Sequence, residues 1–160
     1  SEPGRGTTFK ILLPSLPDAV VTTGTSVRDE SLPGGAPSAS GTVMLVDDEE
    51  SVRKLGQRML ERLGYRALVA CDGREALELF RDKGDEFQCV ILDLTMPNMD
   101  GEETYRELRS IREDVLVVLS SGYGMQGDVR KVMAMGCLGF IQKPYNFKEM
   151  SATIQKALSA

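Results

Sequence analysis

The stretch CVILDLTMPNMDG, residues 89–101, decides how the rest of this sequence is interpreted. It begins with four apolar residues, 89–92, a short continuous run that is typical of a strand buried on both faces. The run ends at Asp93, and the turn at residues 99–101 then leads into a helical pattern. Ligands bind at the carboxyl edge of the strands in open α/β sheets, so Asp93 is a candidate functional carboxylate. Capping of a strand or turn is the alternative role for one isolated aspartate.

Composition limits the classes of protein to which the chain can belong. Its 160 residues suit one domain with some additional chain, and a hydrophobic content of 41% is enough for a core. The net charge of −5 argues against a nucleic-acid partner, which normally requires a basic face. Neither a bilayer-spanning apolar run nor a signal-peptide pattern occurs in the sequence, so we expect no membrane contact by this chain and a cytoplasmic location.

The cysteines and histidines restrict the chemistry further. Cys71, Cys89 and Cys137 lie far apart, without a CxxC spacing and each in or beside an apolar segment. This placement predicts small buried core residues rather than a disulfide framework, which suits a reducing compartment. The sequence has no histidine, so no histidine of this chain can serve as a general base, a metal ligand or a phosphocarrier.

The first 40 residues differ in character from the remainder. Proline, serine, threonine, glycine and alanine without periodicity predict a flexible linker over residues 15–40. Before it, residues 4–14, GRGTTFKILLP, form a glycine turn and a strand-like run that ends in proline. This piece is similar to the end of the ATP-binding domain of sensor histidine kinases, so we expect residues 1–14 to be a remnant of such a domain. Residues 41–160 are expected to form one regular domain.

From residue 41 onward, short apolar runs alternate with helical patterns. The expected strands are residues 42–46, 65–71, 89–92, 115–119 and 137–141, and each is followed by a helical pattern. Three helix starts carry a capping residue followed three positions later by glutamate: Asp72 with Glu75, Asp100 with Glu103, and Asn146 with Glu149. Five β-α units predict an α/β, three-layer, doubly wound fold with a five-stranded parallel sheet and five helices.

Polar residues follow four of the expected strands, and parallel strands end at the same edge of a sheet. Asp47 and Asp48 follow the first strand, Asp93 the third, Ser120 the fourth and Lys143 the fifth. Each has an ordinary explanation when taken singly, such as a first-turn acid, a loop or a solvated turn, but their coincidence at one edge favours a site.

A cluster of three carboxylates needs positive charge, because like charges at close range disfavour one another. Lys143 supplies one positive charge. A hard divalent cation with oxygen ligands, Mg²⁺ or alternatively Mn²⁺, would supply the rest. An anionic phosphoryl group can then approach Asp93.

Four motifs together resemble the receiver domain of two-component response regulators: VDDEE at residues 46–50, LDLTMPNMDG at 92–101, LSSG at 119–122 and FIQKP at 140–144. The resemblance extends over residues 42–160. It implies a flavodoxin-like sheet with the strand order 2-1-3-4-5.

The resemblance also implies the roles of individual residues. Asp93 would be the phosphoryl acceptor and, with Asp48, would ligate Mg²⁺ through its carboxylate. Thr95 would ligate the ion through its backbone carbonyl, and Asp47 through a water molecule. Lys143 would pair with the phosphoryl oxygens.

Three further positions match the part of the family that responds to phosphorylation. Ser120 matches the Thr/Ser switch, whose hydroxyl moves to the new phosphoryl group, and Phe140 matches the aromatic switch that turns inward with it. Gly122 and Thr95 flank the position of the attacking water, so they would tune the lifetime of the phosphate.

The function implied is phosphorelay signal transduction. Because the chain has no histidine, the phosphohistidine donor must lie on a histidine-kinase dimerisation domain or on a histidine phosphotransfer protein. The aspartyl phosphate would switch the surface of the fourth helix, fifth strand and fifth helix, with phosphotransfer and dephosphorylation self-catalysed rather than those of a stand-alone enzyme. Together with residues 1–14, this predicts the C-terminal receiver of a hybrid sensor histidine kinase; a free single-domain regulator is the alternative.

Other functions fit the sequence less well. A haloacid-dehalogenase-like phosphatase also uses a strand-end aspartate with Mg²⁺, but it requires a second aspartate at the position that Thr95 occupies. A receiver-like interaction module that is never phosphorylated would be expected to lack the acidic pair, the acceptor or the lysine. All of these residues are present in this sequence.

Overall fold

The computed structural model describes residues 40–122 and 127–159. The predicted kinase remnant at residues 1–14 and the predicted linker, apart from Ser40, lie outside the described residues. Strands and helices alternate along the described part, with one short 3₁₀ turn, η1, before the third strand. The elements are β1 (Thr42–Val46), α1 (Glu50–Arg62), β2 (Arg66–Ala70), α2 (Gly73–Lys83), η1 (Gly84–Glu86), β3 (Phe87–Asp93), α3 (Gly101–Ile111), β4 (Val117–Ser121), α4 (Asp128–Ala134), β5 (Gly139–Gln142) and α5 (Phe147–Leu158).

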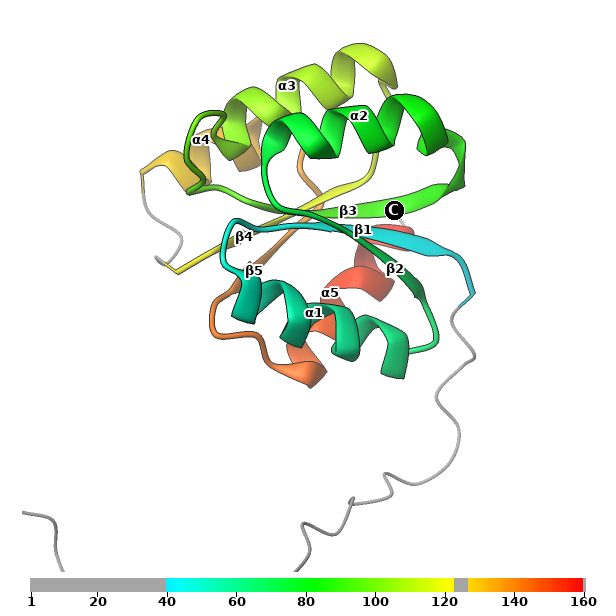
Figure 1. The fold of residues 1–160 in the computed structure, drawn as a ribbon. Helices are drawn as coiled ribbons and strands as arrows, with labels where there is room; N and C mark the ends of the chain where they lie inside the picture. The colour runs from blue at the N-terminus through cyan, green and yellow to red at the C-terminus, as the bar shows by residue number, and fades with distance from the viewer. Residues whose placement is uncertain (1–39, 123–126, 160) are drawn as a thin grey trace, which may run out of the picture. The chain divides into compact units, whose positions relative to one another are not determined.

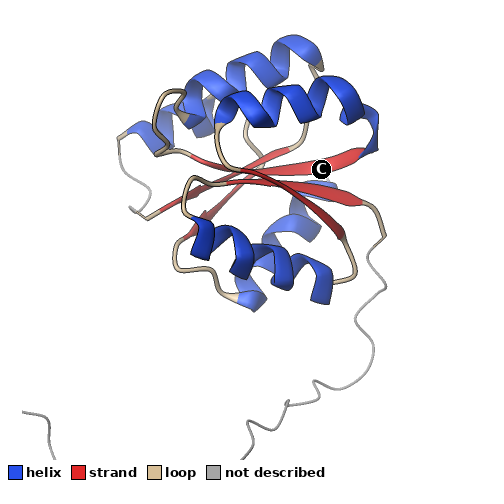
Figure 2. Cartoon of the chain, in the orientation of Figure 1, coloured by secondary structure: helices blue, strands red, loops and turns tan. Residues whose placement is uncertain are grey.

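The five strands form one parallel sheet in the order β2-β1-β3-β4-β5. Helices α1 and α5 cover one face of the sheet, and α2, α3 and α4 cover the other (Figures 1 and 2). This arrangement confirms the predicted three-layer α/β fold and its strand order. Such winding follows from right-handed crossovers between parallel strands.

The sheet is buried on both faces, which explains why its central strands are continuous apolar runs rather than alternating ones. In β1, Val43 and Leu45 pack in the core under α1 and α5, whereas Met44 and Val46 pack in the core under α2 and α3. Every residue of β1 is buried. The central strands therefore form a rigid base that ends at the edge carrying the polar residues.

The predicted helix starts are confirmed by their capping hydrogen bonds. The side chain of Asp72 accepts from the backbone N–H of Glu75 at 2.8 Å, and that of Asp100 accepts from Glu103 at 2.8 Å. The side chain of Asn146 accepts from the N–H of Lys148 at 2.9 Å. Each cap satisfies donors that the first helical turn leaves without an intrahelical partner.

Three predicted strand ranges are wrong by about two residues, and the first of these, the third strand, begins at Phe87 rather than at residue 89. The fourth strand is residues 117–121 rather than 115–119, because Val115 belongs to a turn in which its N–H donates to the carbonyl of Arg112 at 3.2 Å. The fifth strand is residues 139–142 rather than 137–141, since its pairing with β4 begins at Gly139. Val115 and Cys137 are buried outside the strands, so apolarity alone places the strand ends poorly.

The prediction that all three cysteines are buried is wrong for Cys71. Cys89 and Cys137 are buried, but Cys71 is exposed because β2 ends at Ala70. Cys71 lies in the turn before α2, where its backbone N–H donates to the carboxylate of Glu75 at 2.6 Å.

Within residues 40–122 and 127–159, no helix has both the length and the apolarity needed to cross a lipid bilayer.

Gly101 connects the fold to the candidate site. It begins α3, and a Cβ atom there would lie 2.4 Å from the carbonyl oxygen of Asp93 and 2.7 Å from the Cα of Leu94. Both atoms belong to the backbone, which cannot move aside as the end of a flexible side chain can. The absence of a side chain at residue 101 therefore lets α3 begin directly against the end of β3.

We expect Gly101→Ala to lower the free energy of unfolding by about 2 kcal/mol, as overpacking of a core typically does. Gly84→Ala is the matched control, because the nearest atom to its Cβ would lie 3.6 Å away, in the ring of Phe80. Urea denaturation of both variants and the wild type measures the difference. Equal stability of the two variants would contradict this account of Gly101.

Candidate functional site

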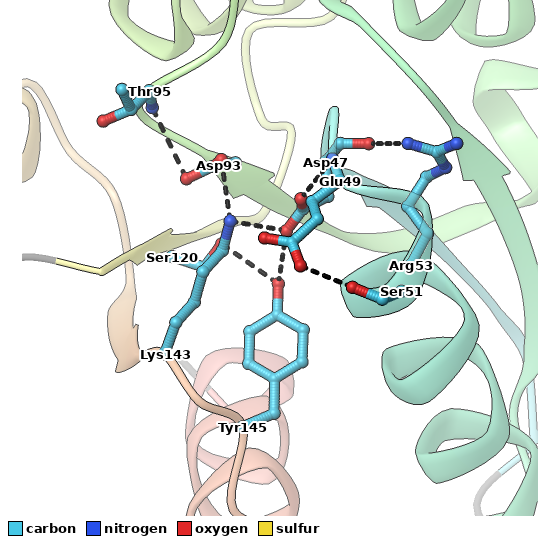
Figure 3. Close-up of polar contacts among 9 residues, drawn as sticks. All are labelled: Asp47, Glu49, Ser51, Arg53, Asp93, Thr95, Ser120, Lys143 and Tyr145. Carbon is cyan, nitrogen blue, oxygen red and sulfur yellow. Dashed lines mark hydrogen bonds and ion pairs between the residues drawn. The ribbon is translucent and has the colours of Figure 1, made fainter. Parts of the chain in front are cut away.

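The carboxyl ends of four strands bring the predicted polar residues to one edge of the sheet (Figure 3). Asp47 directly follows β1, Asp93 is the last residue of β3, and Lys143 directly follows β5. Ser120 lies in β4, where it pairs with Asp93 on one side and with Ile141 on the other. The parallel register therefore sets these side chains next to one another.

Lys143 forms the centre of the site. Its Nζ lies 2.7 Å from Oδ2 of Asp93 and 2.6 Å from Oδ2 of Asp47. Asp47 is fully buried and Asp93 is 2% exposed. One ammonium group therefore serves two buried carboxylates, and these three groups together carry a net charge of −1 when ionised.

The carboxylate of Asp47 is held from several directions. Its Oδ1 accepts from the backbone N–H of Glu49 at 3.0 Å. The backbone of Asp47 is also fixed: its N–H donates to the carbonyl of Ala70 at 3.1 Å, and its carbonyl accepts from the guanidinium of Arg53 at 2.5 Å. Contacts from β2 and from the start of α1 therefore anchor Asp47.

Burial and the ammonium group act in opposite directions on Asp93. Burial raises the pKa of the Asp93 carboxyl above its usual value, while the hydrogen bond and the charge of Lys143 lower it, and burial has the larger effect. Burial alone would lower the pKa of Lys143, but the two carboxylates beside it outweigh burial and raise that pKa. Lys143 is therefore firmly charged at neutral pH.

The donor set suits a hard divalent cation. Ligand oxygens of Asp47, Asp48 and Asp93 lie within 4.8 Å of one another, and Asp48 is exposed while the other two are buried. Carboxylate oxygens are the ligands that Mg²⁺ and Mn²⁺ prefer, and the cluster has one exposed side through which an ion can enter. Thr95, also exposed, donates its backbone N–H to Oδ1 of Asp93 at 3.4 Å. The residues present therefore fit a divalent metal.

Two predicted residues lie outside this polar cluster. Phe140 lies in β5 opposite Leu119, and its partly buried ring packs against the core on the α2–α3 side. Gly122 follows β4 and is exposed, with nothing within 4 Å of a Cβ placed there. Residues 123–126, which come next, lie outside the described part of the chain.

Tyr145 belongs to the site but was missed by the sequence analysis. Its hydroxyl oxygen lies 3.2 Å from Oδ2 of Asp47 and 3.2 Å from Oγ of Ser120 (Figure 3). The ring is buried, and burial is the main cause that raises the pKa of this tyrosine. Its position two residues after Lys143, in the same loop between β5 and α5, is the signal that could have identified it.

We expect Lys143→Met to lower the free energy of unfolding by about 3 kcal/mol at pH 7 in the absence of metal, as loss of one partner of a buried pair does. The loss should be smaller near pH 4.5. Without the ammonium group the pKa of the Asp93 carboxyl rises further above its unfolded value, so the folded variant gains stability as Asp93 binds a proton. In the wild type, the contribution of Lys143 to stability is present below the pKa of a lysine in the unfolded chain, 10.5, and is lost only as the pH rises through the higher pKa of folded Lys143.

Denaturation curves at several pH values measure this difference. Lys54→Met is the matched control, because Lys54 pairs with Glu50 at the surface with 65% of its side chain exposed. Its effect should stay below about 1 kcal/mol. A loss in Lys143→Met that does not change between pH 7 and pH 4.5 would contradict the proposed neutralisation of buried carboxylates.

Comparison with known proteins identifies the family. The family model described as "Response regulator receiver domain" matches residues 43–155. The chain is 38% identical over 165 aligned residues to the sensor kinase CckA of Brucella abortus (strain 2308). That alignment covers 99% of this chain but only 17% of the kinase, so the chain spans about a sixth of this relative.

Solved structures agree with this family. A response regulator receiver domain protein from Clostridium thermocellum is 25% identical, with a TM-score of 0.71 over 74% of this chain and 94% of that one. The receiver domain of a sensor histidine kinase from Pseudomonas aeruginosa, which has a magnesium ion in its active site cleft, shares the fold at 23% identity. Its TM-score is 0.69 over 76% of this chain and 100% of that one. This chain therefore belongs to the family of response regulator receiver domains, the receiving modules of two-component phosphorelay signalling.

Proposed function

We propose that this receiver accepts a phosphoryl group on Asp93 from a phosphohistidine of another domain or protein, in a reaction that depends on Mg²⁺. The observation that carries the proposal is the ion pair of Asp93 with Lys143 at 2.7 Å, beside two further carboxylates at the edge of the sheet. An acidic cluster with one lysine suits an anionic phosphoryl group only when a cation completes it.

In this mechanism an oxygen of the Asp93 carboxylate attacks phosphorus, and the bond between phosphorus and the imidazole nitrogen of the donor breaks. The leaving imidazole keeps the electron pair of that bond. The ammonium group of Lys143 pairs with the Asp93 carboxylate before transfer and with a phosphoryl oxygen afterwards. The two carboxylates beside Lys143 raise its pKa, so Lys143 is protonated before transfer.

The metal would be held by the carboxylates of Asp48 and Asp93 and by the backbone carbonyl of Thr95, with Asp47 bound through water. When bound, Mg²⁺ supplies positive charge that neutralises the oxygens of the transferring group. The ion would enter from the side of the exposed Asp48, and the buried Asp47 would contribute a further negative charge to the site.

The response to phosphorylation would run through Ser120 and Phe140. The Ser120 hydroxyl moves to the phosphoryl group, and the ring of Phe140 turns inward behind it. The elements that change are α4, β5 and α5, which then present a different surface to a partner. The exposed Thr95 and Gly122 would tune the lifetime of the phosphate by controlling access of water.

The wider context proposed is a hybrid sensor histidine kinase, with residues 1–14 as the end of its ATP-binding domain, residues 15–40 as a linker and residues 41–160 as the receiver. The alignment with the Brucella sensor kinase supports a kinase context for the chain, because it covers 99% of the chain. The donor would then be the phosphohistidine domain of the kinase or a histidine phosphotransfer protein, and the receiver would work in the cytoplasm. A receiver-like interaction module without phosphorylation remains the competing function.

We expect wild-type chain incubated with acetyl phosphate and Mg²⁺ to gain one phosphoryl adduct by intact mass spectrometry. Asp93→Asn should gain none, because an amide cannot form the acyl phosphate. Omitting Mg²⁺ should abolish the adduct in the wild type. Full labelling of Asp93→Asn would contradict the assigned acceptor, and absence of labelling in the wild type would favour the interaction module.

A second measurement addresses the switch. Beryllofluoride mimics a phosphoryl group on a carboxylate when Mg²⁺ is present. In ¹H–¹⁵N NMR spectra, its addition together with Mg²⁺ should shift the amide signals of α4, β5 and α5, including that of Phe140. Lys143→Met should bind the mimic with much smaller shifts in these elements, because the group that pairs with the phosphoryl oxygens is gone. Full-size shifts in this variant would argue against the role of Lys143.

A further inference from the structure

The hydroxyl group of Tyr145 connects two parts of the site that are otherwise separate. It lies 3.2 Å from the Asp47 oxygen that also accepts from Lys143, and 3.2 Å from the hydroxyl of Ser120. Tyr145, Ser120 and Asp47 are all buried, with exposed fractions of 6%, 0% and 0%. Water therefore has little access to these hydrogen bonds.

The single proton of the tyrosine hydroxyl gives the chain of bonds a direction. A bond to a carboxylate is stronger than one to a neutral hydroxyl, so Tyr145 donates to Asp47. The oxygen of Tyr145 is then left as an acceptor, and Ser120 donates its proton to it. Hydrogen bonds in such a chain polarise one another, which strengthens the hold on Ser120.

Helix α1 leaves room for the tyrosine ring at Gly56. A Cβ at residue 56 would lie 3.1 Å from Cε2 of Tyr145 and 2.5 Å from Cδ2 of Leu45. Glycine is unfavourable inside a helix relative to alanine, but at this position it allows the helix to approach the ring closely. The ring is therefore fixed by packing from α1 as well as by its two hydrogen bonds.

We propose that Tyr145 is a positioning residue that holds the Ser120 hydroxyl in its resting place, so that the phosphoryl group on Asp93 must compete with Tyr145 for it. This inference rests on the proposed function of Asp93 as acceptor and deepens it. Ser120 has one hydroxyl proton, and it can donate that proton to Tyr145 or to a phosphoryl oxygen, but not to both at full strength.

The same geometry couples the switch to the acidic cluster. The loop between β5 and α5 carries both Lys143 and Tyr145, and both donate to one oxygen of Asp47. When Ser120 leaves, Tyr145 keeps its bond to Asp47, so the carboxylate stays oriented during the switch. Removing only the tyrosine hydroxyl should therefore ease the movement of Ser120 while the ring and its packing remain.

The test is a double-mutant cycle between Tyr145→Phe and Ser120→Ala, read by the apparent affinity for beryllofluoride with Mg²⁺ in ¹H–¹⁵N NMR titrations. Tyr145→Phe should tighten binding about fivefold relative to the wild type, which corresponds to one ordinary hydrogen bond that need not be broken. In the Ser120→Ala background the tightening should disappear. Ser120→Thr, which keeps a hydroxyl, should restore it.

Two controls separate this role from a merely structural one. Tyr65→Phe removes a hydroxyl from another buried tyrosine just before β2, at the opposite edge of the sheet, and should leave the affinity unchanged in every background. Urea unfolding of the metal-free variants gives a second cycle, in which the effect of Tyr145→Phe on the unfolding equilibrium constant should differ about fivefold between the Ser120 and Ser120→Ala backgrounds.

The outcomes are distinguishable. If the wild type binds no beryllofluoride in the presence of Mg²⁺, the proposed function of Asp93 is overturned and the inference fails with it. If the wild type binds but Tyr145→Phe changes the affinity by the same factor with and without the Ser120 hydroxyl, only the role of Tyr145 is overturned. A coupling that depends on the hydroxyl at residue 120, with no effect of Tyr65→Phe, supports it.

Discussion

The structure depends on the burial of two carboxylates beside one ammonium group. At the separation found among Asp47, Asp48 and Asp93, two carboxylates repel by roughly 3 kcal/mol at an effective dielectric constant of about 20. Lys143 offsets that repulsion for the two buried members at 2.6 and 2.7 Å. The strand order is what makes this possible, because β1 and β3 are neighbours and β5 lies two strands beyond β3. The fold therefore creates an acidic site that is only partly neutralised and favours a further cation.

The site and the proposed response to phosphorylation share atoms. The Asp47 oxygen that accepts from Lys143 also accepts from Tyr145, and Tyr145 contacts the hydroxyl of Ser120. In the proposed response Lys143 pairs with a phosphoryl oxygen, and Tyr145 loses its bond to Ser120 but keeps its bond to Asp47, so both effects meet in the loop between β5 and α5. Glycine at two positions makes room for this arrangement: Gly101 lets α3 begin against Asp93, and Gly56 admits the ring of Tyr145 beside α1.

The alternation of apolar runs with helical patterns was sufficient to predict the fold class, whereas the strand order was implied by the family resemblance. The rule that parallel strands end at one edge was sufficient to bring Asp47, Asp93 and Lys143 together. The ends of β4 were mispredicted because Val115 is buried in a turn, where apolarity does not mark a strand. Tyr145 was missed for a different reason. A tyrosine after Lys-Pro has no periodicity to mark it. Its place two residues after Lys143 indicates that it is near the site, but the side-chain geometry is needed to show that its hydroxyl reaches Asp47 and Ser120.

Transfer from a phosphohistidine tests the central claim most directly. A histidine-phosphorylated kinase domain would be mixed with the chain in Mg²⁺, the product reduced with borohydride, and the peptide that contains residue 93 analysed by mass spectrometry. Borohydride converts an aspartyl phosphate to homoserine, so the account predicts homoserine at position 93 and loss of phosphate from the donor. An unmodified Asp93 in a chain that has gained the phosphate elsewhere would contradict it.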